Sequence, residues 1–333
     1  MVRFGILGFG LHAAKRLMPG FLRAKNSRVA AISRRELGTA ENSARSYGIP
    51  FAFGSAAELC RCPEVDAVFV ASPNACHLGD VLLALECGKP VLCEKPMGIN
   101  AQQCKEMLEA AHKVGLSLGV AHVFRFAESV IRMRERLRLG QIGKPILARC
   151  EFSYNGMQHP RQWINDPVLA GGGPIADVGV HCIDVLRFVL CDEVEGVHAC
   201  AVFDPSRGME STAALALQFR QGTLAVVTVS KLVAYRTPLE FVGDAATLRA
   251  EDGLSVDRPV RLELLHDGAV ESEQITNELA YARQVDAFAA AVEGKTEFAV
   301  PAEEGWRNQL VLDAAYRSLK TGKNEGIPSL CRA

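Results

Sequence analysis

The chain has 333 residues, of which 49% are hydrophobic and 23% charged, and its formal net charge at pH 7 is -1. This length suggests two domains, and the apolar share is enough to bury a core in each. The near-neutral balance excludes a nucleic-acid partner, and the lack of a long apolar run excludes a membrane span, so we expect a cytoplasmic protein.

A glycine-rich turn follows the first predicted strand, residues 3–7. The turn matches the pattern G-x-G-x-x-A and reads Gly8-Phe9-Gly10-Leu11-His12-Ala13. Gly8 allows the tight turn, Gly10 lets the backbone approach a pyrophosphate, and Ala13 lets the following helix pack on the strand. The amino terminus of that helix offers N–H groups to phosphates. We therefore predict dinucleotide binding, and we expect no signal peptide because strand-like sequence begins at once.

The second predicted strand, residues 29–32, ends in Ser33-Arg34-Arg35. An NAD site has Asp or Glu at this point to bind the ribose 2′-hydroxyl, whereas here the acidic residue Glu36 comes later. A serine hydroxyl and two guanidinium groups instead suit a 2′-phosphate. We predict NADP as the cofactor and keep NAD as the alternative, in which the arginines are solvated loop charges.

Apolar strands and helices then alternate up to residue 122. The strand over residues 66–71 runs into Ser72, Pro73 and Asn74, and His77 lies at the start of the next helix. Repeated βα units with apolar strands predict a parallel, doubly wound sheet. These four residues would line the cofactor crevice at the carboxyl end of a strand. His77 fits equally well as a helix-start residue that caps its neighbours.

A further buried strand, residues 91–93, leads directly into Glu94, Lys95 and Pro96. Lys95 is therefore expected at the carboxyl edge of the sheet, where open α/β sheets bind ligands. The alternative is a surface lysine whose stem lies over apolar neighbours. We favour the first interpretation, with Glu94 and Lys95 beside the cofactor, because the flanking segments converge on the same crevice.

The pattern changes after residue 122. Strand-like alternation begins at residue 146, and further apolar runs joined by short turns predict a mostly antiparallel sheet. A polar and aromatic loop with Tyr154 and Trp163 is expected to select the substrate. The runs at 213–219 and 223–229 are apolar on both faces. We therefore predict a homodimer or homotetramer that forms through this sheet.

One helix of the second half, from residue 174 to about 190, is apolar nearly all round and follows three glycines at 171–173. Asp177, His181 and Asp184 share one face of it, at positions i, i+4 and i+7. A carboxylate one turn before a histidine can orient it and tune its charge. The spacing also fits two metal ligands, but no third is evident, so we predict no metal. The other interpretation is a helix-start aspartate and a core histidine.

Together these residues resemble the glucose–fructose oxidoreductase / inositol dehydrogenase (Gfo/Idh/MocA) family over nearly the whole chain. The resemblance implies a Rossmann domain, here 1–122, and an α+β domain with an open, mostly antiparallel sheet, here 123–333, with the active site between them. In this family the peptide bond before the proline that matches Pro96 is often cis, which fixes the direction of the lysine. The resemblance rests on the glycine turn, Glu94-Lys95-Pro96, Arg125, the turn at 140–145, the glycines at 171–173 and Asp177-x-Gly179-x-His181.

The resemblance also implies NAD(P)-dependent oxidation or reduction of a sugar, polyol or related diol. In that chemistry His181 can act as the base, Asp177 can orient it or hold a substrate hydroxyl, and Lys95 can donate to the reacting oxygen. The reversed assignment, with Lys95 as the proton carrier, stays open. Two other functions also stay open, glycoside hydrolysis with bound NAD as a redox relay and non-catalytic sensing of a nucleotide or sugar.

The expected contacts fall into two sets. The substrate is expected to contact Lys95, Arg125, Tyr154, Trp163, Asp177 and His181. The cofactor is expected to contact Gly8, Gly10, Leu11, Ser33, Arg34, Arg35, Ser72, Pro73, Asn74, His77, Glu94 and Lys95.

Overall fold

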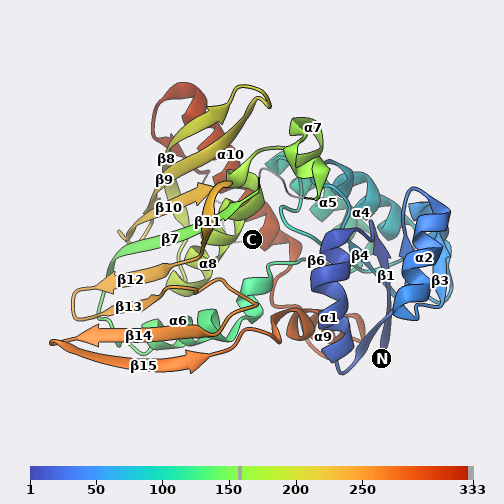
Figure 1. Ribbon diagram of the computed structural model, residues 1–333, viewed down its shortest axis with the longest axis horizontal. Helices are drawn as coiled ribbons and strands as arrows, with labels where there is room; N and C mark the ends of the chain where they lie inside the picture. The colour runs from blue at the N-terminus through green and yellow to red at the C-terminus, as the bar shows by residue number, and fades with distance from the viewer. Residues whose placement is uncertain (157–159, 329–333) are drawn as a thin grey trace. The chain divides into compact units, whose positions relative to one another are not determined.

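The computed structural model describes residues 1–156 and 160–328, and the chain forms two compact units (Figure 1). The first unit comprises Met1–His122, Val168–Gly171 and Tyr281–Gln309. The second comprises Val123–Pro167, Gly172–Ala280 and the chain from Leu310 onward. The division at residue 122 is where we predicted it. Residues 281–309, which we placed in the second domain, pack in the first unit instead.

A six-stranded parallel sheet forms the centre of the first unit, in the order β3-β2-β1-β4-β5-β6. The order reverses between β1 and β4, as in a doubly wound fold, so the prediction of a parallel α/β sheet is confirmed. Every residue of β4 is fully buried, as expected for a strand covered on both faces. The strands are β1 (Val2–Leu7), β2 (Ser27–Ser33), β3 (Phe51–Phe53), β4 (Ala67–Val70), β5 (Val91–Cys93) and β6 (Leu118–Val120).

The helices of this unit alternate with its strands, and local sequence sets their ends. The helix over residues 101–114 starts after Asn100, whose side chain accepts the N–H of Gln103 at 2.9 Å, and ends at Gly115, which has a φ of 67°. The elements are the π-helix η1 (Ala13–Leu17), α1 (Met18–Arg23), α2 (Leu37–Tyr47), α3 (Ala56–Arg61), the 3₁₀ turn η2 (Asn74–Cys76), α4 (His77–Glu86) and α5 (Ala101–Val114).

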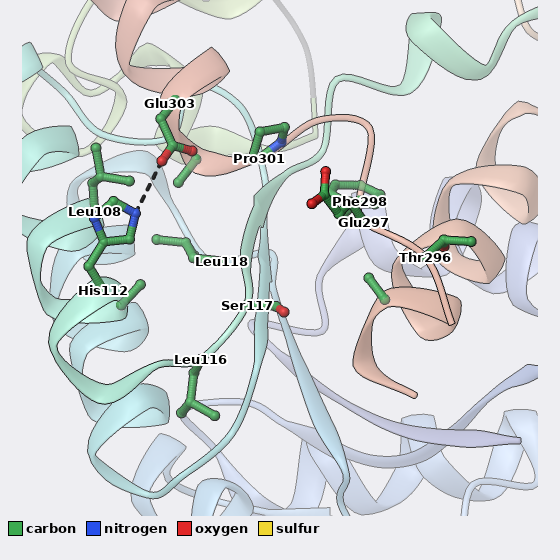
Figure 2. A pocket seen from close by; sticks show the side chains of 13 residues that line it. Leu108, His112, Leu116, Ser117, Leu118, Thr296, Glu297, Phe298, Pro301 and Glu303 are labelled. Carbon is green, nitrogen blue, oxygen red and sulfur yellow. Dashed lines mark hydrogen bonds and ion pairs between the residues drawn. The ribbon is translucent and has the colours of Figure 1, made fainter. Parts of the chain in front are cut away.

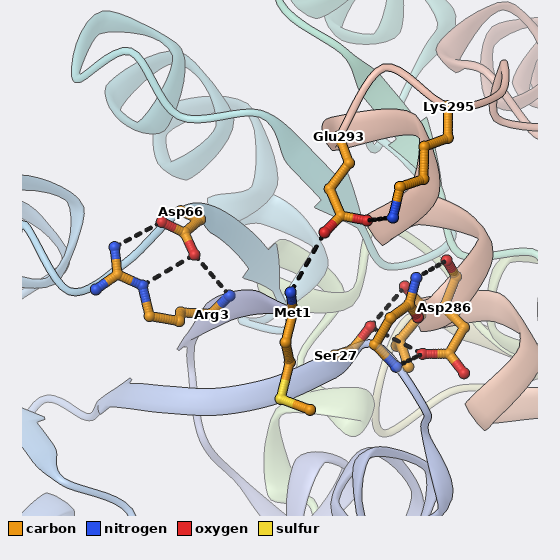
Figure 3. A network of polar contacts seen from close by, with 9 residues as sticks. Met1, Arg3, Ser27, Asp66, Asp286, Glu293 and Lys295 are labelled. Carbon is orange, nitrogen blue, oxygen red and sulfur yellow. Dashed lines mark hydrogen bonds and ion pairs between the residues drawn. The ribbon is translucent and has the colours of Figure 1, made fainter.

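Helix α9 (Ala280–Val292) returns to the first unit late in the chain and is followed by α10 (Ala302–Thr321). The ring of Phe288 is fully buried, 6.2 Å from that of Phe4 in β1. Figure 3 shows the Asp286 carboxylate beside Ser27, whose hydroxyl donates to it at 3.1 Å. Burial of a side chain such as Phe288 contributes roughly 1.5–3 kcal/mol, which explains why α9 belongs to this unit.

A ten-stranded sheet forms the second unit, in the order β15-β14-β13-β12-β7-β10-β9-β8-β16, with β11 paired to β7. Strands β7 and β10 pair in parallel and the other pairs are antiparallel, so the predicted open, mostly antiparallel sheet is confirmed. The strands are β7 (Pro145–Asn155), β8 (Val194–Asp204), β9 (Met209–Phe219), β10 (Leu224–Ser230), β11 (Leu232–Arg236), β12 (Leu239–Gly243), β13 (Thr247–Ala250), β14 (Val260–His266), β15 (Ala269–Ile275) and β16 (Glu325–Gly326).

The helices between these strands include the long apolar one that we predicted. It consists of a π-helical turn, η5 (Ile175–Gly179), and the helix α8 (Val180–Leu190), which packs on β7 and beside α6 (Glu128–Arg138) (Figure 1). Shorter elements are η3 (Val123–Phe126), η4 (Gln162–Asn165) and α7 (Pro167–Ala170). Within residues 1–156 and 160–328, none of the helices has both the length and the apolar character needed to cross a membrane.

Candidate functional site

The glycine turn lies at the carboxyl edge of the six-stranded sheet. Gly8 follows β1 with a φ of 75°, and a Cβ added to it would lie 2.6 Å from the backbone nitrogen of Ser72. A side chain at position 8 would therefore collide with the segment after β4. The space beside Gly10 is open, since the heavy atom nearest to an added Cβ is the Gly8 oxygen at 3.8 Å. The first glycine permits the turn and the second leaves the backbone accessible.

The residues around this turn fit a dinucleotide. The helix after Gly10 begins beside the open space and presents its amino terminus there, where backbone N–H groups suit a pyrophosphate. Leu11 and His12 are half-buried at its start, and Ala13 is fully buried. The N–H of Phe9 donates to the Ser33 oxygen at 3.0 Å, which fixes the turn to the end of β2.

The residues predicted to bind the substituent on the ribose 2′ carbon lie at the end of β2. Ser33 is buried, Arg34 is half-buried and Arg35 is exposed. Nη1 of Arg34 donates to the Ser43 hydroxyl in α2 at 3.2 Å. A guanidinium has five N–H donors, so this bond leaves others for a phosphate.

Polar contacts hold the segment after β4. The Ser72 hydroxyl donates to Oδ2 of Asp80 at 2.6 Å, and the Asn74 amide donates to the Ala170 oxygen at 2.8 Å. Burial raises the pKa of Asp80, and the hydrogen bond from Ser72 opposes that shift. Pro73 is half-buried between them. The three residues lie at the strand end where we expected them, and their contact with the cofactor stays a prediction.

His77 is fully buried and joins two segments of the carboxyl edge. Its Nδ1 lies 2.9 Å from the Pro96 oxygen and its Nε2 lies 3.0 Å from the Ser72 oxygen. Burial lowers the pKa of His77, and the two carbonyl groups oppose that shift. A neutral imidazole carries one N–H, so it donates to one of these oxygens at a time. This geometry favours the structural interpretation of His77 over direct contact with a cofactor.

Lys95 follows β5 at the same edge of the sheet. The Glu94 N–H donates to the Val70 oxygen of β4 at 2.9 Å, and the Lys95–Pro96 peptide bond is cis. Glu94 is buried, with its Oε1 2.9 Å from Nε2 of His12. Burial raises the pKa of Glu94, but the charges and hydrogen bonds of His12 and Lys95 lower it, and the net shift is downward. Glu94 is therefore ionised at neutral pH beside the half-buried Lys95.

In the second unit, the hydroxyl of Tyr154 in β7 donates to Oδ2 of Asp177. Asp177 belongs to the π-helical turn η5, an element that is frequent at functional sites. Burial and the Asp177 charge raise the pKa of Tyr154, so its phenol stays protonated and donates. We predicted that Tyr154 contacts the substrate, and the structure places its hydroxyl on the predicted catalytic carboxylate.

His181 in α8 lies against two phenyl rings and is 8% exposed. Its ring meets that of Phe124 edge-on, with centroids 4.9 Å apart, and stacks on that of Phe152, with centroids 5.8 Å apart. These contacts fix the plane of the imidazole. A group that transfers a proton to or from a bound ligand needs such a fixed orientation.

Asp184, the third polar residue on the predicted face, forms an ion pair with Arg125. Nη2 and Nε of Arg125 donate to Oδ1 of Asp184 at 2.7 and 3.0 Å. Both side chains are buried, 8% and 1% exposed. Arg125 was predicted to bind the substrate, and in the structure two of its N–H groups donate to Asp184.

Two polar residues beside Asp177 were not selected from the sequence. Lys231, between β10 and β11, is 3% exposed, and its Nζ donates to the Ile164 oxygen at 3.1 Å. Oε1 of Glu210 accepts the N–H of Ile175 at 3.1 Å and the hydroxyl of Tyr316 at 2.9 Å. The sequence signal for Lys231 was a lysine that directly follows an apolar strand.

The glycines before η5 are explained by the same neighbours. A Cβ added to Gly173 would overlap the backbone oxygen of Glu210, and one added to Gly172 would overlap the hydroxyl of Tyr316. These glycines therefore allow Glu210 and Tyr316 to approach the start of the helix that carries Asp177 and His181. The reason for glycine at these two positions is therefore close packing.

A cavity of about 350 Å³ lies elsewhere in the first unit (Figure 2). Its rim includes His112, whose Nε2 lies 3.1 Å from Oε1 of Glu303. Ser117 lines it and directly precedes β6, so the cavity lies at the amino ends of the strands. We assign ligand binding to the opposite edge, because open parallel sheets bind ligands at the carboxyl ends of their strands.

Among the residues that the structure describes, no group of three His, Cys, Asp or Glu side chains is placed to hold a metal ion.

The sequence matches two family models. Residues 2–122 match the model of an oxidoreductase family with an NAD-binding Rossmann fold, and residues 130–249 match that of the GFO/IDH/MocA C-terminal domain. The chain belongs to the Gfo/Idh/MocA oxidoreductase family. The family predicted from the motifs is confirmed, and the chain is an NAD(P)-dependent dehydrogenase or reductase.

Members of the Gfo/Idh/MocA family resemble this chain over most or all of its length. The 1,5-anhydro-D-fructose reductase of Ensifer adhaerens is 30% identical over 97% of this chain and 98% of its own. The trans-1,2-dihydrobenzene-1,2-diol dehydrogenase of Mus musculus is 34% identical over 69% of this chain and 68% of its own. The crystal structure of the aldose-aldose oxidoreductase from Caulobacter crescentus shares the fold, with a TM-score of 0.90, 24% identity, and coverage of 98% and 99% of the two chains.

Proposed function

We propose that this enzyme transfers a hydride between a nicotinamide and a carbinol or carbonyl carbon of a sugar, polyol or diol. The observation that carries the proposal is that Asp177 and His181, one turn apart, are both held in place, Asp177 by Tyr154 and His181 by two phenyl rings. Fixed groups of this kind suit a reaction in which a hydroxyl proton leaves in step with the hydride. The names of the reductase and the diol dehydrogenase above give substrates of the same chemical class.

In this proposal His181 is the general base. Its neutral imidazole takes the proton of the substrate hydroxyl during oxidation and returns it during reduction. Asp177 orients the imidazole or accepts a neighbouring substrate hydroxyl. Tyr154 supports that role because its hydroxyl holds the Asp177 carboxylate in one position.

Lys95 donates a hydrogen bond to the reacting oxygen and stabilises the negative charge that develops there. Glu94 and His12 hold the segment in which Lys95 lies. The bound nicotinamide supplies the hydride acceptor or donor, and the glycine turn with Gly8 and Gly10 is the part of the chain that would hold the pyrophosphate. In the alternative assignment, Lys95 carries the proton and His181 forms a hydrogen bond with the substrate.

We further propose that NADP is the preferred cofactor. Arg34 and Arg35 follow β2 directly, where the 2′-phosphate of a bound dinucleotide would lie, and Ser33 ends the strand. A charge-assisted pair with a phosphate is stronger than a neutral hydrogen bond. NAD would be the better cofactor if an acidic side chain stood at this strand end.

We also propose that the enzyme forms a homodimer or homotetramer through the sheet of the second unit. The strand register places Val202, Leu224 and Val226 on one face. These side chains are 63%, 47% and 42% exposed, whereas Ala225 and Val227 on the other face of β10 are buried. An apolar patch of this kind on a soluble enzyme marks an interface, and a second copy of the same face matches it.

The experiment that tests the activity mixes the purified enzyme with NADP or NAD and a panel of sugars, polyols and diols. The absorbance of the reduced nicotinamide measures net turnover. The proposal expects stoichiometric reduction of added cofactor by at least one member of the panel. Hydrolysis of a glycoside with no net change in the cofactor would instead support the redox-relay alternative.

A further inference from the structure

Lys231 contacts both ends of the segment that carries Trp163. Its backbone oxygen accepts the N–H of Gly156 at 2.8 Å, and its Nζ donates to the Ile164 oxygen at 3.1 Å. The segment leaves β7 at Gly156 and reaches Ile164 in η4, next to Trp163, and residues 157–159 lie outside the described residues. Lys231 thus makes one contact before residues 157–159, with Gly156, and one after them, with Ile164.

Lys231 is buried to an extent that is rare for a lysine, at 3% exposed. Burial lowers the pKa of its ammonium group, the carboxylates of Asp177 and Glu210 raise it, and Arg161 and Arg207 lower it further. A buried cation of this kind needs nearby negative charge. Lys231 therefore links the Trp163 segment electrostatically to the carboxylate that the proposed chemistry uses.

The two carboxylates that face Lys231 are themselves fixed. Glu210 accepts the N–H of Ile175 at the start of η5, and Asp177 in the same turn accepts the hydroxyl of Tyr154. The charges of Asp177 and Glu210 therefore act on Nζ from fixed positions, while the Ile164 oxygen in η4 accepts its hydrogen bond. A shift of η4 would break this hydrogen bond or move Nζ relative to the two carboxylates.

The space beside Lys231 is too small for a substrate. The cavity that it lines together with Glu210, Arg207 and Asn165 measures about 10 Å³, enough for about one water molecule. Arg207 donates from Nη1 to Oδ1 of Asn165 at 3.1 Å, which adds a second contact to the end of η4. On this side Lys231 can act only through its neighbours.

We propose that Lys231 is a positioning residue that fixes the Trp163 segment relative to the helix of Asp177 and His181, and thereby sets which substrates the enzyme accepts. The part of this inference that concerns substrates rests on the proposed sugar or diol oxidoreductase activity. The part that concerns the segment does not, because the contacts with Gly156 and Ile164 exist without a substrate.

The test compares Lys231→Met, which keeps the length of the side chain, with Lys231→Arg, which keeps charge and donors. Lys144→Met, at an exposed lysine, is the matched control. Hydrogen exchange is followed in peptides within residues 160–166 of the full-length protein, without substrate. We expect faster exchange there in Lys231→Met, wild-type exchange in Lys144→Met and an intermediate result in Lys231→Arg. If Lys231→Met does not fold, the comparison of Lys231→Arg with Lys144→Met decides.

The second readout is the ratio of kcat/KM for a small diol to that for a hexose. A residue that acts on a site without touching the ligand changes affinities several-fold, so Lys231→Met should change this ratio several-fold while NADP affinity stays the same. Unchanged exchange in residues 160–166 would overturn the positioning role. Faster exchange with an unchanged ratio would overturn the role in selectivity. A wild type that turns over no member of the panel of sugars, polyols and diols would contradict the proposed function, and the exchange result would still decide the positioning role.

Discussion

Nε2 of His12 lies 2.9 Å from Oε1 of Glu94, although the two residues are 82 positions apart in the chain. Oε2 of the same carboxylate accepts the N–H of Lys95 at 3.2 Å. Glu94 thus joins the glycine turn to the segment of the proposed catalytic lysine. Because its charge is buried, this link depends on both partners staying in place.

The Glu94 link predicts a pH-dependent stability. The net pKa of Glu94 is lowered in the folded protein, so between the folded and unfolded pKa values the unfolded chain binds more protons and stability rises with pH. Glu94→Gln should therefore lower the free energy of unfolding by roughly 1–3 kcal/mol near pH 6. This difference should shrink as the pH falls below the ordinary glutamate value of 4.5. Urea denaturation at several pH values measures it, and a difference independent of pH would contradict the role of the charge.

The buried pair of Arg125 and Asp184 predicts non-additive losses. Arg125→Met leaves a carboxylate that is 1% exposed without its cation, which should cost about 3–5 kcal/mol of unfolding free energy. Asp184→Leu should cost a similar amount, and the double variant should cost clearly less than the sum. Urea denaturation of the four proteins gives the coupling. Strictly additive losses would show that the pair contributes nothing as a pair.

The NADP proposal predicts a selective loss of affinity. Arg34→Ala removes a guanidinium that would bind the 2′-phosphate, and loss of a charged hydrogen bond is worth roughly 1.5–3 kcal/mol. NADP should bind about tenfold more weakly or worse, while NAD affinity stays the same. Titration of both cofactors by intrinsic fluorescence or calorimetry measures this. Equal losses for the two cofactors, or a wild type that prefers NAD, would contradict the proposal.

The exposed face of the second-unit sheet predicts a change in assembly. Val226→Glu places a charge in the middle of the apolar face and should shift the enzyme toward monomer at micromolar concentration. Val114→Glu, at an exposed valine at the end of α5 in the first unit, is the control and should leave the assembly unchanged. Light scattering measures the mass. A wild type that is strictly monomeric would contradict self-association through this face.

Much of the fold was predictable because its signals are local in the sequence. The fully apolar strand β4 and the position of Lys95 directly after β5 follow from short runs of residues. The pairing of His12 with Glu94 could not be predicted in this way, since it joins residues from separate βα units. Helix α9 was misplaced for a similar reason, because its apolar face shows that it is buried but not which sheet it covers.

The candidate site shows the same limit. Spacing placed Asp177 and His181 on one helix, but it gave no sign that Tyr154 holds the first and two phenylalanines flank the second. Spacing also grouped Asp184 with them, whereas its charge is neutralised by Arg125. The burial of Lys231 depends on η4, a segment more than sixty residues earlier in the chain.

The most direct test of the account is the pH profile of alcohol oxidation by His181→Ala and Lys95→Met. If His181 is the base, His181→Ala should lower turnover by about two to four orders of magnitude, keep cofactor affinity and lose the rise in rate through the histidine range. Lys95→Met should be impaired but keep that rise. If only Lys95→Met loses this rise, Lys95 and not His181 is the general base. Turnover like that of the wild type in both variants would contradict the assignment of the site.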